Sequence, residues 1–159
     1  MANIIAEERV RCAPETATSL IEPALQRISS EGKMTVRVPA EVIGIHSPIA
    51  LEQEVSFRVA HARDQARLND ILTIRWEPVG DKLAPVFHGT LSCDADSVPT
   101  ESMLALQGTY DVPGGLVGRA FDDAVGFWIA RATMHDLLER LASTIEELDA
   151  ERATAAPHR

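Results

Sequence analysis

Histidines and cysteines, the side chains best suited to proton transfer and metal binding, are spread widely along the sequence. The histidines are His46, His61, His88, His135 and His158. No two of them stand at the close spacing of a zinc site, and Cys12 and Cys93 form no Cys-x-x-Cys pair. His135 stands four residues before Glu139 on a predicted helix, which is typical of a solvated face. The sequence therefore predicts no bound metal and no cofactor.

His61 is the strongest candidate for an acid or base. It stands two residues after Val59 and four after Phe57 in a segment where apolar and polar residues alternate. This spacing places it on the apolar side of a predicted strand. It also stands at the end of that strand, beside Arg63 and Asp64, where we expect the mouth of a cavity. The sequence indicates no partner for it and no other catalytic constellation. This pattern favours a binding protein over an enzyme.

Two other groups of reactive side chains, Cys93 and the acidic residues that follow it, are expected to have structural rather than chemical roles. Cys93 alternates onto an apolar face, where burial raises the pKa of a thiol and disfavours its use as a nucleophile. Asp94, Asp96 and Glu101 offer oxygen ligands for a hard cation. They lack the glycine and the terminal glutamate spacing of a calcium loop, so we predict a polar turn there.

These side chains are positioned by a predicted sheet. Between residues 33 and 111, apolar and polar residues alternate with a period of two, which indicates half-buried antiparallel strands. The predicted strands in this region are 34–38 with a continuation over 42–45, 54–59, 71–77, 87–93 and 103–110. A further strand is predicted at Ile4–Arg11.

Two predicted helices accompany the sheet. The first follows Pro14, with apolar residues at helical spacing up to Ile28. Pro23 is expected to kink or divide it, and Gly32 to cap its end. The second occupies residues 116–150 as one continuous pattern, about 50 Å long. Since helices and strands do not alternate, we predict an α+β fold with an antiparallel sheet of six to seven strands curled around the C-terminal helix.

Length and charge restrict the function classes. The 159 residues fit one domain, placed at 1–149, with a frayed polar tail at 150–159. A net charge of −9 argues against nucleic acid and anionic membranes as partners. No apolar run approaches the length of about 18 residues that a membrane span needs. The first residues lack the features of a signal peptide, and two cysteines are too few for a disulfide framework, so we expect a cytoplasmic protein with reduced thiols.

The C-terminal half carries the most specific sequence pattern. Leu104–Asp122, with the sequence LALQGTYDVPGGLVGRAFD, is followed by Ile129–Thr133 and by Leu137-Leu138. This pattern resembles the end of the SRPBCC superfamily, the START and birch-pollen-allergen-like proteins that include polyketide cyclases. Small bacterial members have Gly-x-Tyr in a strand, a Pro/Gly turn, and Gly-x-x-x-Asp at the start of the last helix. Trp76 and Phe87–Gly89 fit the same group.

The resemblance implies a helix-grip fold with a cavity between the curved sheet and the C-terminal helix. Members of the superfamily bind lipids, sterols, polyketides or other apolar ligands, and some are cyclases, hydratases or hydrolases. This chain differs from typical members in its one short helical region after the first strand, which is expected to narrow the cavity mouth. We expect a small apolar ligand to contact Phe57, Val59, Ile74, Trp76, Phe87, Leu91, Leu104, Leu106, Tyr110, Phe121, Val125 and Trp128.

Alternation does not distinguish a ligand cavity from a solid core, so these residues would equally fill a core. Tyr110 and Trp76 carry polar groups that would orient a ligand, or would be satisfied within the protein. Next to Leu106, Gly108 lacks a side chain and is expected to leave room for a ligand.

Two other functions stay open. One is an enzyme of the polyketide cyclase or dehydratase kind, in which one Tyr or His transfers the proton. The other is an interaction module that forms a homodimer through the end of the C-terminal helix. Its seam would be a coiled-coil-like stripe of Met134, Leu138, Leu141, Ile145 and Leu148. The alternative for this stripe is that it covers the chain's own sheet.

Overall fold

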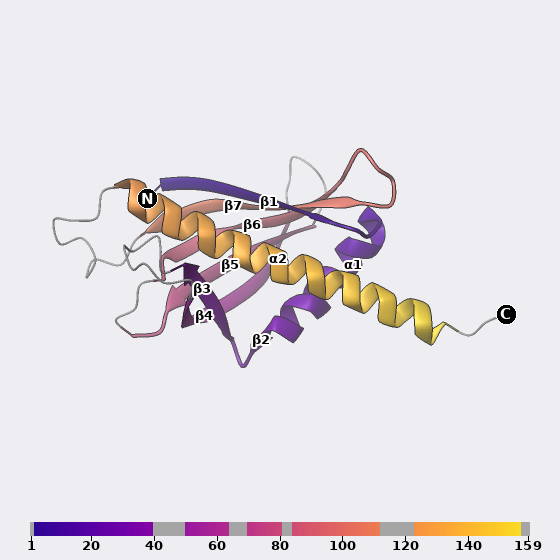
Figure 1. Ribbon diagram of the computed structural model, residues 1–159, viewed down its shortest axis with the longest axis horizontal. Helices are drawn as coiled ribbons and strands as arrows, with labels where there is room; N and C mark the ends of the chain where they lie inside the picture. The colour runs from indigo at the N-terminus through magenta and orange to yellow at the C-terminus, as the bar shows by residue number, and fades with distance from the viewer. Residues whose placement is uncertain (1, 40–49, 64–69, 81–83, 112–122, 157–159) are drawn as a thin grey trace.

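The computed structural model describes residues 2–39, 50–63, 70–80, 84–111 and 123–156 of the chain. These residues form seven strands and two helices (Figure 1). In chain order the elements are β1 (Ala2–Val10), α1 (Pro14–Ile28), β2 (Ser29–Ser30), β3 (Lys33–Pro39), β4 (Ala50–Arg63), β5 (Asp70–Pro78), β6 (Val86–Ala95), β7 (Ser102–Asp111) and α2 (Asp123–Ala155). The predicted strand at 42–45 and the predicted helix start at 116 lie outside the described residues.

The seven strands form one antiparallel sheet in the order β1-β7-β6-β5-β4-β3-β2. The first strand therefore pairs with the last one, while the remaining neighbours follow the chain. Figure 1 shows α2 running across one face of the curved sheet, with α1 beside its C-terminal half. This arrangement is the predicted α+β helix-grip-like fold.

The core lies between the sheet and α2. On β7, Leu104 and Leu106 are fully buried, as alternation predicts. Leu138 and Leu141 of α2 are fully buried as well. Burial of such a side chain contributes about 1.5–3 kcal/mol, so this layer is a major source of stability. The layer leaves the long helix firmly attached to the sheet.

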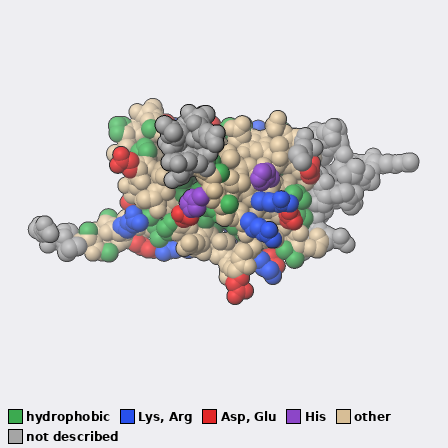
Figure 2. All heavy atoms as spheres, turned by 180° about the vertical axis from the view of Figure 1, so that it is seen from behind, with side chains coloured by type: hydrophobic (Ala, Val, Ile, Leu, Met, Phe, Trp, Pro, Cys, Tyr) green, Lys and Arg blue, Asp and Glu red, His purple; other side chains and the backbone are tan. Residues whose placement is uncertain are grey.

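The opposite face of the sheet is polar, which agrees with the predicted half-buried strands. Arg58, Arg75 and His88 lie in register on β4, β5 and β6, and all three are exposed. Figure 2, which views the molecule from the side opposite α2, shows acidic and basic side chains mixed, with hydrophobic ones scattered. The prediction that His88 lies on the polar face is confirmed.

The first helix, α1, forms where its sequence predicts. Pro14 occupies the first turn, where its missing N–H costs no hydrogen bond, and Glu15 follows it. The buried face consists of Ala17, Leu20, Ile21, Ala24 and Leu25. Pro23 lies within α1, but the helix is not divided and runs from Pro14 to Ile28 as one element.

The expected cap of α1 at Gly32 is wrong. The helix ends at Ile28, and its C-cap is Ser29, whose hydroxyl and backbone N–H both donate to the carbonyl oxygen of Leu25. Glu31 and Gly32 instead form the two-residue turn between β2 and β3, with φ angles of 51° and 72°. Positive φ at both central positions is the geometry of a tight hairpin turn, which explains the glycine.

The C-terminal helix ends later in the sequence than predicted. It continues to Ala155, although a frayed tail was expected from residue 150. Residues 150–156 are exposed, but Glu151 is held by the guanidinium of Arg27 on α1, with N–O distances of 3.0 and 3.1 Å. This ion pair joins the last turns of α2 to α1. Neither described helix has a segment both long and apolar enough to cross a membrane.

The apolar stripe that suggested dimerisation is used inside the chain. Met134, Leu138, Leu141 and Ile145 are each 0% exposed, and Leu148 packs against the same core. The stripe therefore covers the chain's own sheet, and these residues offer no seam to a second copy.

Gly89 and Gly108 pair across β6 and β7 at a point of close backbone approach. A Cβ atom on Gly108 would lie 2.3 Å from the carbonyl oxygen of His88, and one on Gly89 would lie 2.2 Å from that of Gln107. The expectation that Gly108 leaves room for a ligand is therefore wrong, because neighbouring backbone fills that space.

We expect Gly108→Ala to lower the free energy of unfolding by about 1–3 kcal/mol, because the added methyl group forces the two strands apart. Urea denaturation followed by circular dichroism measures this change. Gln107→Ala, at an exposed position of the same strand, is the matched control and should stay within about 0.5 kcal/mol of the wild type. An unchanged midpoint for Gly108→Ala would show that the strands separate at no cost.

Candidate functional site

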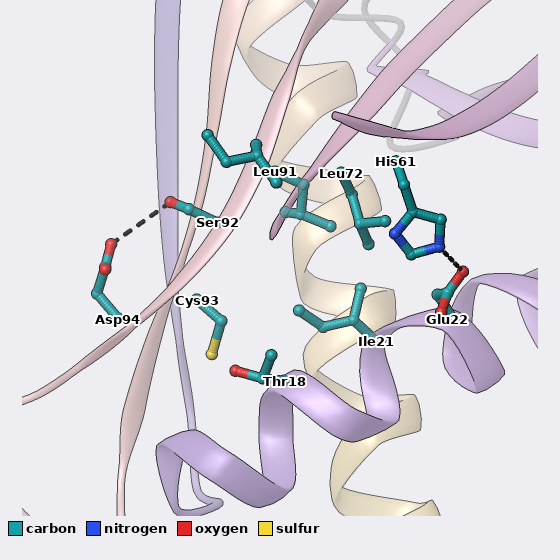
Figure 3. A pocket seen from close by; sticks show the side chains of 10 residues that line it. Thr18, Ile21, Glu22, His61, Leu72, Leu91, Ser92, Cys93 and Asp94 are labelled. Atoms are coloured by element: carbon teal, nitrogen blue, oxygen red, sulfur yellow. Dashed lines mark hydrogen bonds and ion pairs between the residues drawn. The ribbon is translucent and has the colours of Figure 1, made fainter. Parts of the chain in front are cut away.

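A pocket of about 480 Å³ opens between α1 and the sheet (Figure 3). Its apolar wall consists of Ile21 from α1, Leu72 from β5 and Leu91 from β6. Leu72 and Leu91 are cross-strand partners, so the register of β5 and β6 places them side by side. All three are largely buried, at 4%, 8% and 2% exposure. This wall is formed by the packing of α1 on the sheet.

The rim of the pocket carries a hydrogen-bonded histidine and carboxylate. His61, near the end of β4, has Nε2 at 2.7 Å from Oε1 of Glu22 on α1. A carboxylate only accepts hydrogen bonds, so Nε2 carries the proton and the second ring nitrogen, Nδ1, has a free lone pair when the imidazole is neutral. His61 was predicted at the mouth of a cavity between the sheet and the C-terminal helix, and it lies instead at the rim of this pocket beside α1.

The remaining polar groups of the pocket come from α1 and β6. They are Thr18, Ser92, Cys93 and Asp94. Burial raises the pKa of the Cys93 thiol, and hydrogen bonds from Thr18 and Ser102 offset this only in part. The raised pKa favours the protonated thiol at neutral pH, which agrees with the expectation that Cys93 is a poor nucleophile.

The acidic turn after β6 is a set of ion pairs rather than an open ligand cluster. Asp96 lies 2.7 Å from Nε of Arg9, and Glu101 lies 3.5 Å from the same nitrogen. The backbone N–H of Ser97 and the Arg9 guanidinium hold the pKa of Asp96 below its usual range. Over the described residues, no group of three or more His, Cys, Asp and Glu is arranged to hold a metal ion.

Most residues expected to contact a ligand are buried in the core between the sheet and α2. Leu91 lines the pocket beside α1. Exposure is between 0 and 7% for Phe57, Ile74, Trp76, Phe87, Leu104, Leu106 and Tyr110. Trp76 and Phe87 stack with ring centroids 4.3 Å apart. These contacts are those of a packed core. No bound ligand tests whether these residues contact one, so their role in ligand binding stays a prediction.

The other predicted contacts lie at the margins of the fold. Val59 is 37% exposed and, with Phe57, lines a second depression of about 280 Å³ beside α1. Trp128 is 55% exposed, with the guanidinium of Arg131 5.9 Å from its ring centre. Phe121 and the side chain of Val125 lie outside the described residues.

The indole of Trp76 is an exception to normal hydrogen bonding. Its Nε1 is buried, and among the described residues it has no hydrogen-bond partner. A buried indole N–H normally finds one. Within the part of the chain that the structure describes, Trp76 is therefore an unpaired donor in the core.

Sequence reasoning identified His61 and Cys93 but missed Thr18, Ile21 and Glu22. Thr18 and Glu22 are four residues apart, so they lie on one face of α1, next to the buried Ile21. That spacing was visible in the sequence. The direction in which this helix faces the sheet was not.

No protein-family model matches the sequence, and no curated protein is detectably similar to it. Among solved structures, the chain is similar to TTHA0849 from Thermus thermophilus, with 14% identity, a TM-score of 0.48, and coverage of 92% of this chain and 99% of that one. It is also similar to the Zhui aromatase/cyclase from a Streptomyces species, with 15% identity, a TM-score of 0.40, and coverage of 98% and 96%.

Proposed function

We propose that this protein binds a small, largely apolar molecule in the pocket between α1 and the sheet, and that it is a member of the SRPBCC superfamily. The observation that carries the first proposal is the composition of the pocket. A wall of Ile21, Leu72 and Leu91 faces a polar side of the pocket, which consists of Thr18, Glu22, His61, Ser92, Cys93 and Asp94. Small-molecule sites of about 300–1,000 Å³ commonly combine an apolar lining with a few polar groups that fix orientation.

The charge around the pocket selects an uncharged ligand. Glu22 and Asp94 are both part of its lining, and the whole chain carries a net charge of −9. Carboxylate or phosphate groups on a ligand would be repelled by these side chains. A neutral molecule with one or two hydrogen-bonding groups fits the pocket better.

The proposed site differs in position from the expected cavity between the sheet and α2. In that layer Trp76, Leu106 and Leu138 are at most 1% exposed. The short helical region that was expected to narrow a cavity mouth, α1, instead supplies one wall of the pocket.

Filling the pocket from its exposed side tests the proposal. Thr18 is exposed and lines the pocket, so Thr18→Trp adds an indole there without overpacking the core. We expect it to weaken binding of the neutral fluorescent probe N-phenyl-1-naphthylamine at least tenfold, which is about 1.4 kcal/mol. Fluorescence titration measures the affinity.

Ser19→Trp is the matched control, because Ser19 is the exposed neighbour of Thr18 on α1 and does not line this pocket. It should bind the probe as the wild type does. Equal binding by Thr18→Trp and the wild type, or no binding by the wild type, would contradict the proposed site.

A further inference from the structure

The fold joins two side chains that are far apart in the sequence into one polar pair. His61 and Glu22 are 39 positions apart and belong to β4 and α1, yet their side chains lie 2.7 Å apart. Only the packing of α1 against the sheet brings them together. The pair stands at the pocket, where both residues are part of the lining.

The orientation of the pair leaves a basic atom next to the apolar wall. Glu22 accepts the hydrogen bond from Nε2, and Nδ1 of the neutral ring, which carries the lone pair, makes no hydrogen bond within the described part of the chain. In Figure 3, Nδ1 is on the side of the ring away from Glu22, toward Leu72 and Leu91. Leu72 is also the cross-strand partner of His61, which places the imidazole directly beside the wall. A molecule bound against that wall meets Nδ1.

Two carboxylates accompany His61 in the lining of the pocket. Glu22 is in direct contact with the ring, and the carboxylate of Asp94 also lines the pocket. A carboxylate bonded to one nitrogen of a histidine fixes the tautomer and stabilises the imidazolium. His61 and Glu22 are themselves exposed, at 62% and 51% of their side-chain surfaces. Such a pair contributes only about 0–1 kcal/mol to stability, so stability alone gives little reason for it.

We propose that His61 is a catalytic base, positioned by Glu22, that removes a proton from a C–H group next to a carbonyl or imine of the bound molecule. The proposal rests on the pocket being a ligand site. In the step, the C–H bond breaks, an N–H bond forms at Nδ1, and the electron pair stays on the substrate. Return of the proton to another atom completes an isomerisation, so no oxidant, reductant or other reactant is consumed.

A probe reaction tests the base without knowledge of the natural substrate. The neutral, flat molecule 5-nitrobenzisoxazole loses its C–H proton to a base, its N–O bond breaks, and it becomes a nitrile with a coloured phenolate. We expect the wild type to accelerate this reaction above the rate in buffer. His61→Ala should lower kcat at least tenfold while KM changes less than twofold.

Three further variants separate catalysis from structure. His88→Ala removes another exposed histidine, on the polar face of β6, and should leave the rate unchanged. Glu22→Gln should lower kcat severalfold at nearly constant KM, because the amide has no charge to stabilise the imidazolium. Glu22→Asp keeps the charge and should restore part of the lost rate, which a purely structural role of Glu22 would not require.

The outcomes distinguish failure of the base from failure of the binding site. Probe binding that Thr18→Trp blocks, together with equal turnover by the wild type and His61→Ala, would overturn the base and leave the ligand site intact. Turnover that persists in Thr18→Trp would place the reaction outside the pocket and also overturn the proposal. Absence of both naphthylamine binding and turnover in the wild type would overturn both proposals together.

Discussion

Ending the chain after Gly118, which removes the whole of α2, is expected to abolish cooperative folding. Six large α2 side chains have less than 2% of their surface exposed, all within the core. Each contributes about 1.5–3 kcal/mol of burial. Their combined loss is comparable with the entire stability of a typical domain, about 5–15 kcal/mol. The truncated sheet would expose its apolar face and aggregate.

Size-exclusion chromatography and thermal melting by circular dichroism measure this outcome. A point substitution tests the same contact more gently: Leu141→Ala should cost about 2–5 kcal/mol in a urea melt, through lost burial and the cavity left behind. Ser143→Ala, two positions further on the exposed side of α2, is its control and should have little effect. A soluble truncated chain that melts cooperatively would refute the role of α2 as the cover of the sheet.

The fold was largely predictable because its elements follow local patterns. Alternation over β5 to β7 requires only that one face is apolar, and it placed Ile74, Leu104 and Leu106 on the buried side. The end of α1 was not predictable in the same way. The segment Ser29–Gly32 suits both a helix cap and a hairpin turn. The pairing of β2 with β3, and of β3 with β4, decides between them, and that pairing is a tertiary interaction.

The candidate site was predictable only in part. Parity placed His61 on the apolar side of its strand and near an opening, because both properties are local. Glu22 could not be assigned as its partner, since their contact depends on where α1 docks. The position of the pocket could not be predicted from the sequence either. Alternation shows which side chains leave water, but only the packing of α1 and α2 decides where space is left between them.

Cys12 is expected to make the protein lose stability as the pH rises from about 9 to 11. Cys12 is 3% exposed. Burial, followed by the nearby charge of Asp149, raises the pKa of Cys12 from 9.0 to about 11. Between these values the unfolded chain releases the thiol proton and the folded chain keeps it. The unfolded state therefore binds fewer protons, and the free energy of unfolding falls with pH.

A shift of this size corresponds to a loss of about 2.7 kcal/mol once the pH exceeds both values. Urea melts at several pH values between 8 and 11 measure the slope. Burial also raises the pKa of Cys93, so the comparison is made in a Cys93→Ala background, with and without Cys12→Ala. The second substitution changes packing by an amount independent of pH, but it should flatten the slope. An identical slope in both proteins would show that the Cys12 thiol ionises equally in the folded and unfolded states, contrary to its burial.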